Sequence, residues 1–267
     1  MPFSIAGKTA IVTGAANGVG LAIGRHFVDM GANVVFADMD EKRLVAEMGE
    51  IADKEETVRI FAGDLRKKLT IANLLSATVD AFERVDILVN ASRQVLETDP
   101  LDPDDTTVEE LLQQNTLTAL RVSQAVARRM IKQADGDQTA NIGSIVNISS
   151  IAARRTHPDL LAYSMSTAAL DQMTRSLAVA LANNGIRVNA VAFGSVMSAS
   201  LKGRLKEQDD VREAILDNTP LHRIANAGEV SDAVQYLASD ASAFVTGQII
   251  TVDGGRTLID PAAVAAH

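Results

Sequence analysis

The segment Thr13–Gly20, with the sequence TGAANGVG, constrains the fold of this chain more than any other part of it. The preceding residues, TAIV, predict a buried strand, and the following segment, Leu21–Met30, predicts a helix. Gly14 permits a tight turn, Gly18 lets the backbone approach a pyrophosphate, and Gly20 lets the helix pack close to the strand. The segment therefore predicts a strand, a glycine turn and a helix in direct succession.

Such a turn is suited to binding a phosphate group. The N-terminus of the helix offers unpaired backbone N–H groups and the positive end of the helix dipole to an anion. The glycine spacing is G-x-x-x-G-x-G, which differs from the common G-x-G-x-x-G dinucleotide motif. This difference indicates a particular family of dinucleotide-binding proteins.

Composition limits the classes of protein to which the chain can belong. Its 267 residues are 47% hydrophobic, which is enough for one sizeable core, so a single α/β domain over residues 1–267 is expected. The net charge of −9 argues against nucleic acid as a partner, because phosphate backbones require a basic face. The chain has no cysteine, which excludes cysteine catalysis and fits a cytoplasmic location. We find no signal peptide and no membrane-spanning run, and we expect no membrane partner and no metal site.

Strand-like and helix-like segments alternate along the whole chain. Predicted strands are Thr9–Thr13, Asn33–Ala37, Val58–Ala62, Ile87–Asn90, Ser144–Ile148, Arg187–Ala192 and Gln248–Val252. Further predicted helices are Glu41–Ile51, Ile71–Phe82, Val108–Gln133, Leu160–Ala182, Asp209–Asp217 and Val230–Ala238. Apolar strands separated by helices predict a Rossmann-like, doubly wound sheet of seven parallel strands covered on both faces. The polar segment Met197–Thr219 is expected to form a flap over it.

Asp38 follows the second predicted strand and bears on the choice of cofactor. A carboxylate at this point can bind both hydroxyls of an adenosine ribose and repels a 2′-phosphate, which favours NAD over NADP. Met39 comes next, and no arginine or lysine lies in the glycine turn. The alternative is that Asp38 only begins a turn.

Further motifs follow in a recognisable order. They are Asp64-Leu65, Asn90-Ala91, Asn115, the strand IVNISS that ends at Ser150, Tyr163, Thr246-Gly247-Gln248 and Val252-Asp253-Gly254-Gly255. With the glycine turn, these motifs resemble the short-chain dehydrogenase/reductase family from about Ile5 to Gly255. The resemblance implies hydride transfer between a nicotinamide ring and an alcohol or carbonyl carbon.

The resemblance also implies roles for individual residues. Tyr163 is the expected general acid or base, Ser150 holds the substrate oxygen, and Asn115 supports a water that relays protons. Expected cofactor-binding residues are Gly14, Asn17, Gly18, Val19, Gly20, Asp38, Met39, Asp64, Leu65, Asn90, Ala91, Ser92, Tyr163 and Val196. A small-molecule substrate and a homotetramer, with Val108–Gln133 and Leu160–Ala182 packed across subunits, are also implied.

One departure from the family pattern concerns the chemistry itself. A free tyrosine has a pKa of about 10, too high for a base near neutrality, and the family lowers it with a lysine one helical turn later. In this chain that position holds Thr167, whose hydroxyl can contact a ribose but carries no charge. The expected catalytic set is therefore Ser150, Tyr163, Asn115 and Thr167 at the lysine position.

Other departures lie on the same side of the expected site. They are Val89 for asparagine, Ser92 for glycine, Phe193 for proline and Ser198 for threonine. Three hypotheses remain open. Another cation replaces the lysine, or catalysis is slow or uses a substrate that needs little base strength, or the chain is an NAD-binding module or sensor with little activity. Candidate cations are Arg93, Arg154, Arg155 and His157, and any of the three arginines in the cleft would favour an anionic substrate. Simpler alternatives are that Ser150 only caps a turn, Tyr163 only packs at a helix start, Asn115 is an exposed helix residue, and Arg154 and Arg155 are solvated.

Overall fold

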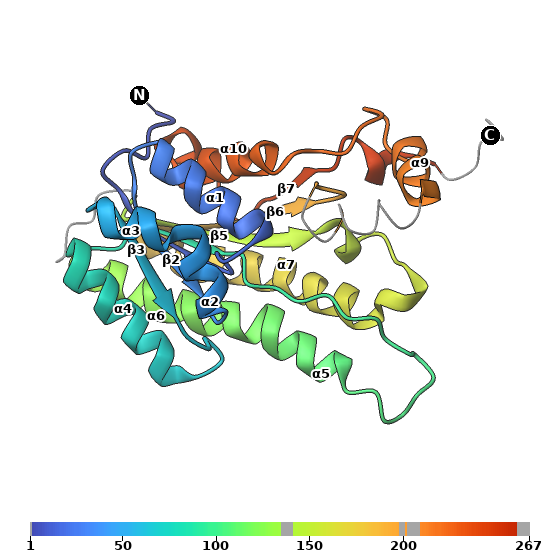
Figure 1. Ribbon diagram of the computed structural model, residues 1–267, viewed down its shortest axis with the longest axis horizontal. Helices are drawn as coiled ribbons and strands as arrows, with labels where there is room; N and C mark the ends of the chain where they lie inside the picture. Colours follow the sequence, from blue (N-terminus) through green and yellow to red (C-terminus); the bar gives the residue numbers. More distant parts are fainter. Residues whose placement is uncertain (1, 135–140, 198–200, 202–208, 261–267) are drawn as a thin grey trace.

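The structure is a computed structural model that describes residues 2–134, 141–197, 201 and 209–260. Seven parallel strands form one sheet in the order β3-β2-β1-β4-β5-β6-β7 (Figure 1). The strands are β1 (Thr9–Thr13), β2 (Asn33–Asp38), β3 (Val58–Ala62), β4 (Ile87–Asn90), β5 (Gly143–Ser150), β6 (Ile186–Phe193) and β7 (Ile249–Val252). The predicted seven-stranded, doubly wound fold is confirmed.

Helices cover both faces of the sheet. The main ones are α1 (Gly18–Asp29), α4 (Lys68–Phe82), α6 (Thr118–Gln133), α7 (Leu161–Leu181), α9 (Asp209–Asp217) and α10 (Ala227–Ala238). Figure 1 shows α1 and α10 on one face and α4, α6 and α7 on the other. Within the described ranges, no helix is both long and apolar enough to cross a bilayer.

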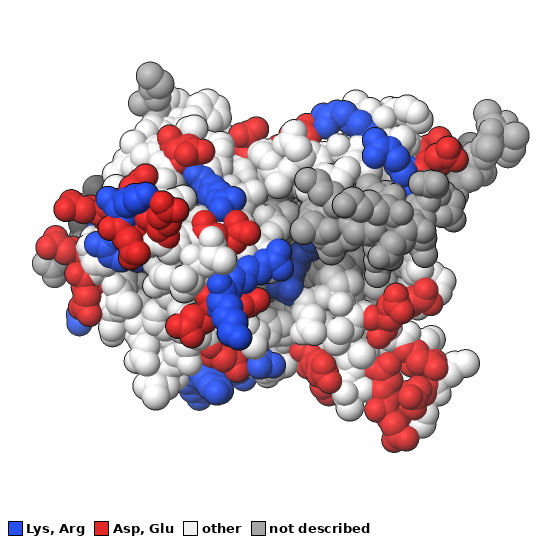
Figure 2. Space-filling view, viewed as in Figure 1, with Lys and Arg blue, Asp and Glu red and all other residues white. Residues whose placement is uncertain are grey.

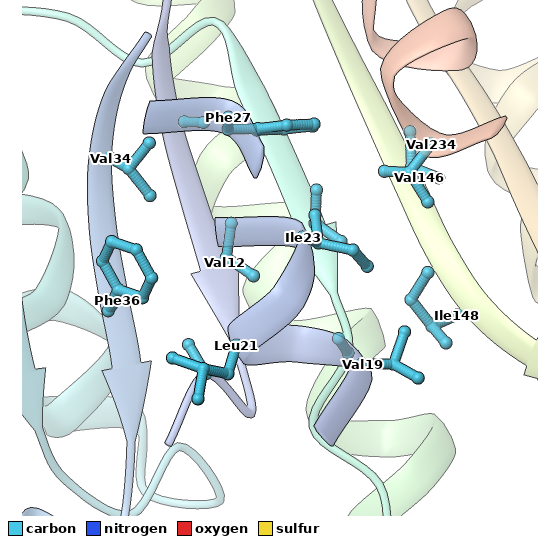
Figure 3. Packing of buried hydrophobic residues seen from close by; sticks show 14 of the residues in the cluster. Val12, Val19, Leu21, Ile23, Phe27, Val34, Phe36, Val146, Ile148 and Val234 are labelled. Carbon is cyan, nitrogen blue, oxygen red and sulfur yellow. The ribbon is translucent and has the colours of Figure 1, made fainter. Parts of the chain in front are cut away.

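Alternation along each strand produces two separate cores. Val12 of β1 faces α1, whereas its neighbour Ile11 packs in the core on the opposite face. Figure 3 shows Ile23 and Phe27 of α1 lying against the sheet, with Val12 among the strand residues below them. Both faces of the central strands are thus buried, which explains why the sequence predicts them as continuous apolar runs.

Some helix boundaries differ from the predicted ones. The helix α10 begins at Ala227, earlier than predicted, because Asn226 and Glu229 form a capping box. The predicted helix over residues 41–51 comprises α2 (Glu41–Leu44), a π-helical turn over Val45–Gly49 and α3 (Glu50–Lys54). The long helix before β5 also contains a π turn, η2 (Leu112–Leu117), between α5 (Thr107–Leu111) and α6.

The predicted flap is described only in part. Its C-terminal portion forms α9, as predicted, whereas most of residues 198–208 lies outside the described residues. Ser198, the position that resembles a carboxamide-contacting threonine, is among those not described.

Acidic side chains gather over the loop that precedes α5 (Figure 2). Asp102 and Asp104 are exposed there, and the carboxylate of Asp105 accepts hydrogen bonds from the N–H and hydroxyl of Thr107. These bonds lower the pKa of Asp105, because they favour its charged form. The loop is thus exposed to solvent, and Asp105 bonds to the first residue of α5.

Candidate active site

The glycine turn lies where the carboxyl end of β1 meets the start of α1. Gly14 has a φ of 65° and Gly18 a φ of 55°, both in the left-handed region that favours glycine. A Cβ on Gly20 would collide with the carbonyl of Gly14, so α1 can approach β1 only with glycine there. A Cβ on Gly18 would meet no atom within 4 Å, because the turn is open at that point. The three predicted roles of these glycines fit this geometry.

The first turn of α1 is suited to an anion. Asn17 precedes the helix in an extended conformation and, within the described chain, makes no side-chain capping bond. That first turn also carries no acidic residue. Its leading N–H groups therefore remain available to a phosphate group.

A small hollow beside the turn brings together residues from four strand ends. Predicted cofactor residues that line it are Gly14, Asp38, Met39, Asp64, Leu65 and Ser92. The carboxylate of Asp38 is held in place by the N–H groups of Ala16, at 2.9 Å, and Asp40, at 3.0 Å. Because parallel strands end at one edge of the sheet, residues distant in sequence converge there.

Arg66 also lines this hollow, although no sequence pattern predicted it. Its guanidinium forms two hydrogen bonds with the carboxylate of Asp64, at 2.9 and 3.0 Å. The bonded guanidinium holds the pKa of Asp64 below its ordinary value. The charge of Arg66 is thus paired within the protein. The acidic residue two positions earlier is the sequence signal that could have identified this pair.

Asn90 contributes differently from the other predicted cofactor residues. Its buried amide donates to Ser123 Oγ at 2.9 Å and to Asn147 Oδ1 at 2.8 Å, which ties β4 to α6 and β5. Its side chain is therefore part of the structural core. The N–H groups of the next two residues, Ala91 and Ser92, donate to the hydroxyl of Thr13.

Three further predicted cofactor residues occupy contrasting positions. Val19 is buried in α1, and Met39 is 60% exposed at the rim of the hollow. Val196 is buried and pairs by a β-bridge with Ala225, after the end of β6. The turn around Val196 is thereby anchored to the segment that precedes α10.

Ser150 is the last residue of β5 and is 7% exposed. Its Oγ accepts a hydrogen bond of 3.1 Å from the N–H of Ala152 and so caps a short 3-10 helix. In the described part of the chain this is its only side-chain hydrogen bond, so its own proton remains available for a ligand. Capping and binding of a substrate oxygen are therefore compatible.

Tyr163 and Thr167 lie one turn apart at the start of α7. Tyr163 is 4% exposed and packs against Ala152, which follows Ser150. The hydroxyl of Thr167 donates to the carbonyl of Tyr163 at 2.9 Å within the helix. Thr167 is buried and carries no charge, so the family's ammonium group has no counterpart at this position.

Arg93 supplies a positive charge at the Tyr163 hydroxyl instead. Its Nη1 atom lies 2.6 Å from that hydroxyl oxygen, and its guanidinium carbon lies 4.3 Å from the centre of the Phe193 ring. Arg93 follows β4 and Phe193 ends β6, so two strand ends converge on the first turn of α7. Phe193, a position that departs from the family pattern, and Tyr163 thus both contact the same arginine.

Asn115 lies in the π turn η2 and is buried, which contradicts the alternative that it is exposed. Its amide donates to the carbonyl of Gln94 at 2.9 Å and to Ser166 Oγ at 3.1 Å, and its oxygen accepts from the N–H of Gln94 at 2.8 Å. Asn115 therefore fixes the backbone beside Arg93 to α7. The π turn shifts the register of the helix at this residue, as such turns often do at functional sites.

The other candidate cations have different partners. Arg154 donates to Thr251 Oγ1 at 3.0 Å and lies 3.9 Å from the carboxylate of Asp171. Arg155 donates to the carbonyl of Thr257, and His157 is exposed. Of the four, Arg93 is the one whose side chain bonds to Tyr163.

Asp171 is a buried carboxyl group on α7 below this cluster. It accepts a hydrogen bond of 2.6 Å from Ser149 Oγ. Burial raises its pKa, and the bond from Ser149 opposes that effect only in part. Asp171 thus anchors the end of β5 to α7.

A glycine turn at a helix start, an acid that ends β2, a serine that ends β5 and a tyrosine at the start of α7 define a dinucleotide-dependent class of α/β protein. A family model described as enoyl-(acyl carrier protein) reductase matches residues 14–257. The chain belongs to the short-chain dehydrogenase/reductase family.

Its relatives include oxidoreductases that act on alcohols and carbonyls. The chain is 32% identical to 2,3-dihydroxy-2,3-dihydro-p-cumate dehydrogenase of Pseudomonas putida over 255 residues, covering 95% of each chain. It is 33% identical to galactitol 2-dehydrogenase (L-tagatose-forming) of Cereibacter sphaeroides over 258 residues, covering 96% of this chain and 97% of that enzyme.

A solved structure has the same fold. It is a 7α-hydroxysteroid dehydrogenase in complex with NADH and 7-oxo glycochenodeoxycholic acid, with a TM-score of 0.86 and 28% identity. The match covers 95% of this chain and 96% of that one.

Proposed function

We propose that this chain is an NAD-dependent oxidoreductase that interconverts an alcohol and a carbonyl compound. The observation that carries the proposal is the Tyr163 hydroxyl, held 2.6 Å from a guanidinium nitrogen at the edge of the sheet where the glycine turn opens. A tyrosine that only packed at a helix start would have no need of a charged partner. Oxidoreductase relatives over nearly the whole chain support the same conclusion.

The residues of the turn fit a dinucleotide. We propose that Gly14, Gly18 and the N-terminus of α1 hold its pyrophosphate, since the turn is open at Gly18 and the helix start is uncapped within the described chain. Asp38 would bind the adenosine ribose, with its carboxylate already oriented by two backbone N–H groups. The remaining residues assigned to the cofactor are Asn17, Val19, Gly20, Met39, Asp64, Leu65, Asn90, Ala91, Ser92, Tyr163 and Val196.

NAD is favoured over NADP for electrostatic reasons. Asp38 would repel a 2′-phosphate, and Arg66, which lines the same hollow, is already paired with Asp64. When bound, NAD supplies or accepts the hydride.

The protein's own residues would manage the proton and the substrate oxygen. Ser150 would donate a hydrogen bond to that oxygen, and Tyr163 would exchange a proton with it. Asn115 would support proton relay by holding the loop at Gln94 against α7. Thr167 would serve the lysine position only as a hydroxyl group.

A second function rests on one observation, the absence of the lysine at Thr167. It is an NAD-binding module or sensor that retains the turn and Asp38 but turns over little substrate. This alternative predicts NADH binding without turnover in the native chain.

The proposed function also includes an oligomeric state and a cellular location. We propose that residues 1–267 form a single domain that assembles as a homotetramer in the cytoplasm, with α6 and α7 at subunit contacts. Light scattering of the purified chain at several concentrations would test the tetramer. A mass of one or two chains at all concentrations would contradict it.

The experiment that tests the function pairs binding with turnover. NADH binding is followed by the emission of NADH itself, and a panel of alcohols and ketones, with and without a carboxylate, is screened for turnover. The native chain, Tyr163→Phe and Thr167→Lys should all bind NADH. If the native chain turns over a substrate and Tyr163→Phe does not, the result supports the proposal that the chain is an oxidoreductase. If only Thr167→Lys turns over a substrate, the result supports the NAD-binding module or sensor.

A further inference from the structure

The hydrogen bond between Arg93 and Tyr163 has a defined direction. A guanidinium group has five N–H donors, no acceptor and a permanent charge. Its contact of 2.6 Å with the tyrosine therefore runs from Arg93 Nη1 to the phenol oxygen. The phenol proton is not used in this bond, and no group among the described residues accepts it, so it is available to a ligand.

Arg93 is held on two sides. Its guanidinium lies over the Phe193 ring, 4.3 Å from the ring centre, an arrangement that favours a cation over an apolar side chain. The backbone of the next residue, Gln94, is fixed by two hydrogen bonds to the buried Asn115. The charge is thus positioned before any ligand arrives, and no side chain must be ordered to bring it there.

The elements that pack against α7 carry few other titratable groups. Neither η2, η3 (Ile151–Ala153) nor β5 has an ionisable side chain, and Arg187 of β6 donates to the carbonyls of Leu237 and Ser239. Glu109 and Glu110 of α5 and Asp159 of η4 (Pro158–Leu160) are exposed to solvent. Arg93 is the charged group in hydrogen-bond contact with the phenol among the described residues.

We propose that Arg93 replaces the missing lysine and stabilises the phenolate form of Tyr163. In carbonyl reduction, Tyr163 would give its proton to the substrate oxygen, and the guanidinium would stabilise the phenolate left behind. In alcohol oxidation, the phenolate would accept the hydroxyl proton, and the tyrosine would return to its neutral form. The catalytic meaning of this contact rests on the proposed function, but the effect on the phenol does not.

The chain permits a direct test without cofactor or substrate. It contains two tyrosines, Tyr163 and Tyr236, and no tryptophan, so Tyr236→Phe leaves one phenol to follow by ultraviolet absorbance. In that background, phenolate absorbance should appear at a lower pH with Arg93 present than in Arg93→Met. This difference is expected because a hydrogen bond from a charged donor favours the phenolate over the neutral phenol. Arg93→Lys should retain part of the difference in the pH at which phenolate absorbance appears.

The matched control is Arg154→Met, which removes an arginine that bonds to Thr251 rather than to Tyr163. It should leave the phenolate transition where it is in the parent protein. Thermal unfolding and NADH binding, measured on every variant, show whether each one is folded. If Arg93→Met does not fold, Arg93→Lys and Phe193→Leu provide the comparison, and both should move the transition to higher pH.

Activity offers a second, separate readout once a substrate is found. The pH profile of kcat should move to higher pH in Arg93→Met, and Thr167→Lys in the same chain should restore it.

Coincident phenolate transitions in the parent and Arg93→Met would overturn the proposal even if the enzyme is active. An unchanged transition with KM raised only for carboxylate-bearing substrates would overturn it too, and would assign Arg93 to the substrate. A shifted transition in a chain that binds no NADH would support the contact while refuting the proposed function.

Discussion

Gly14 and Ser92 lie so close together that a Cβ on Gly14 would be 2.6 Å from the Cα of Ser92. The glycine turn after β1 therefore packs directly on the backbone that follows β4. The three atoms nearest to such a Cβ are all backbone atoms, and the side chain of Ser92 accepts a hydrogen bond of 3.0 Å from Gln114. Serine can thus occupy a position where the family has glycine, because only its backbone approaches Gly14.

Gly14→Ala should destabilise the chain through both backbone strain and collision. The φ of 65° alone costs about 1–2 kcal/mol for a residue with a Cβ, and the contact with Ser92 adds to it. Gly7→Ala is the matched control, since Gly7 has a φ of 73° but its Cβ would meet no atom within 4 Å. Denaturant unfolding should show a clearly larger loss for Gly14→Ala. Equal losses of stability in the two variants would mean that the glycine turn can move away from the backbone at Ser92 at little cost.

Gly18→Ala should affect binding more than stability. Its φ of 55° carries the same backbone cost as at Gly7, and a Cβ would enter open space in the turn. If a pyrophosphate occupies that space, the affinity for NADH should fall at least about tenfold, or about 1.4 kcal/mol. A variant that binds NADH as tightly as the native chain would place the pyrophosphate elsewhere.

Asp38→Asn should weaken NADH binding and reduce the discrimination against NADPH. Hydrogen bonds to a charged carboxylate contribute about 1.5–3 kcal/mol, so the affinity for NADH should fall at least about tenfold. Asp40→Asn is the control, because Asp40 is exposed and caps α2. Calorimetric titration of each variant with both nucleotides measures the effect. An unchanged preference in Asp38→Asn would show that another residue selects the cofactor.

Asn115→Ala should destabilise the loop that carries Arg93. It removes three side-chain hydrogen bonds and leaves both backbone groups of Gln94 without their partner, at a cost of about 2 kcal/mol or more. Asn218→Ala removes one exposed bond to Ala214 and should change the free energy of unfolding by less than about 0.5 kcal/mol. Chemical unfolding compares the two, and similar small changes would contradict a structural role for Asn115.

Glu229→Gln should change how stability depends on pH. Hydrogen bonds from Arg223 and from the N–H of Asn226 lower the pKa of Glu229 from 4.5 to about 2 in the folded chain. Its ionised form is therefore favoured by folding, and this contribution is complete above pH 4.5 and lost as the pH falls towards 2. The difference in Tm between native chain and variant should shrink over that range. Glu50→Gln, which removes an exposed pair with Lys54, should show a smaller difference above pH 4.5.

The sheet could be predicted from the sequence because its strands are buried on both faces. All five residues of β1 are buried, and a run of this kind has few alternatives between two helical segments. Helix ends were harder to predict, since Asn226 and Glu229 cap α10 through side-chain bonds that leave no apolar pattern. The π turn around Asn115 changes the hydrogen-bond register without changing the spacing of apolar residues.

The site could be predicted in part for similar reasons. The turn and Asp38 are local features, because the turn directly follows β1 and Asp38 is the last residue of β2. The partner of Tyr163 is not local, since Arg93 lies 70 residues away along the chain. The sequence contains four candidate cations for this role. Only the packing of the loop after β4 against α7 distinguishes Arg93 from the other three.

Equilibrium titration with NADH and NADPH tests the proposed activity most directly. The native chain should bind NADH saturably and more tightly than NADPH, and Tyr163→Phe should bind NADH equally well while losing all turnover of any substrate found. A native chain that shows no saturable binding of NADH would contradict the proposed function, whatever the chemistry at Tyr163.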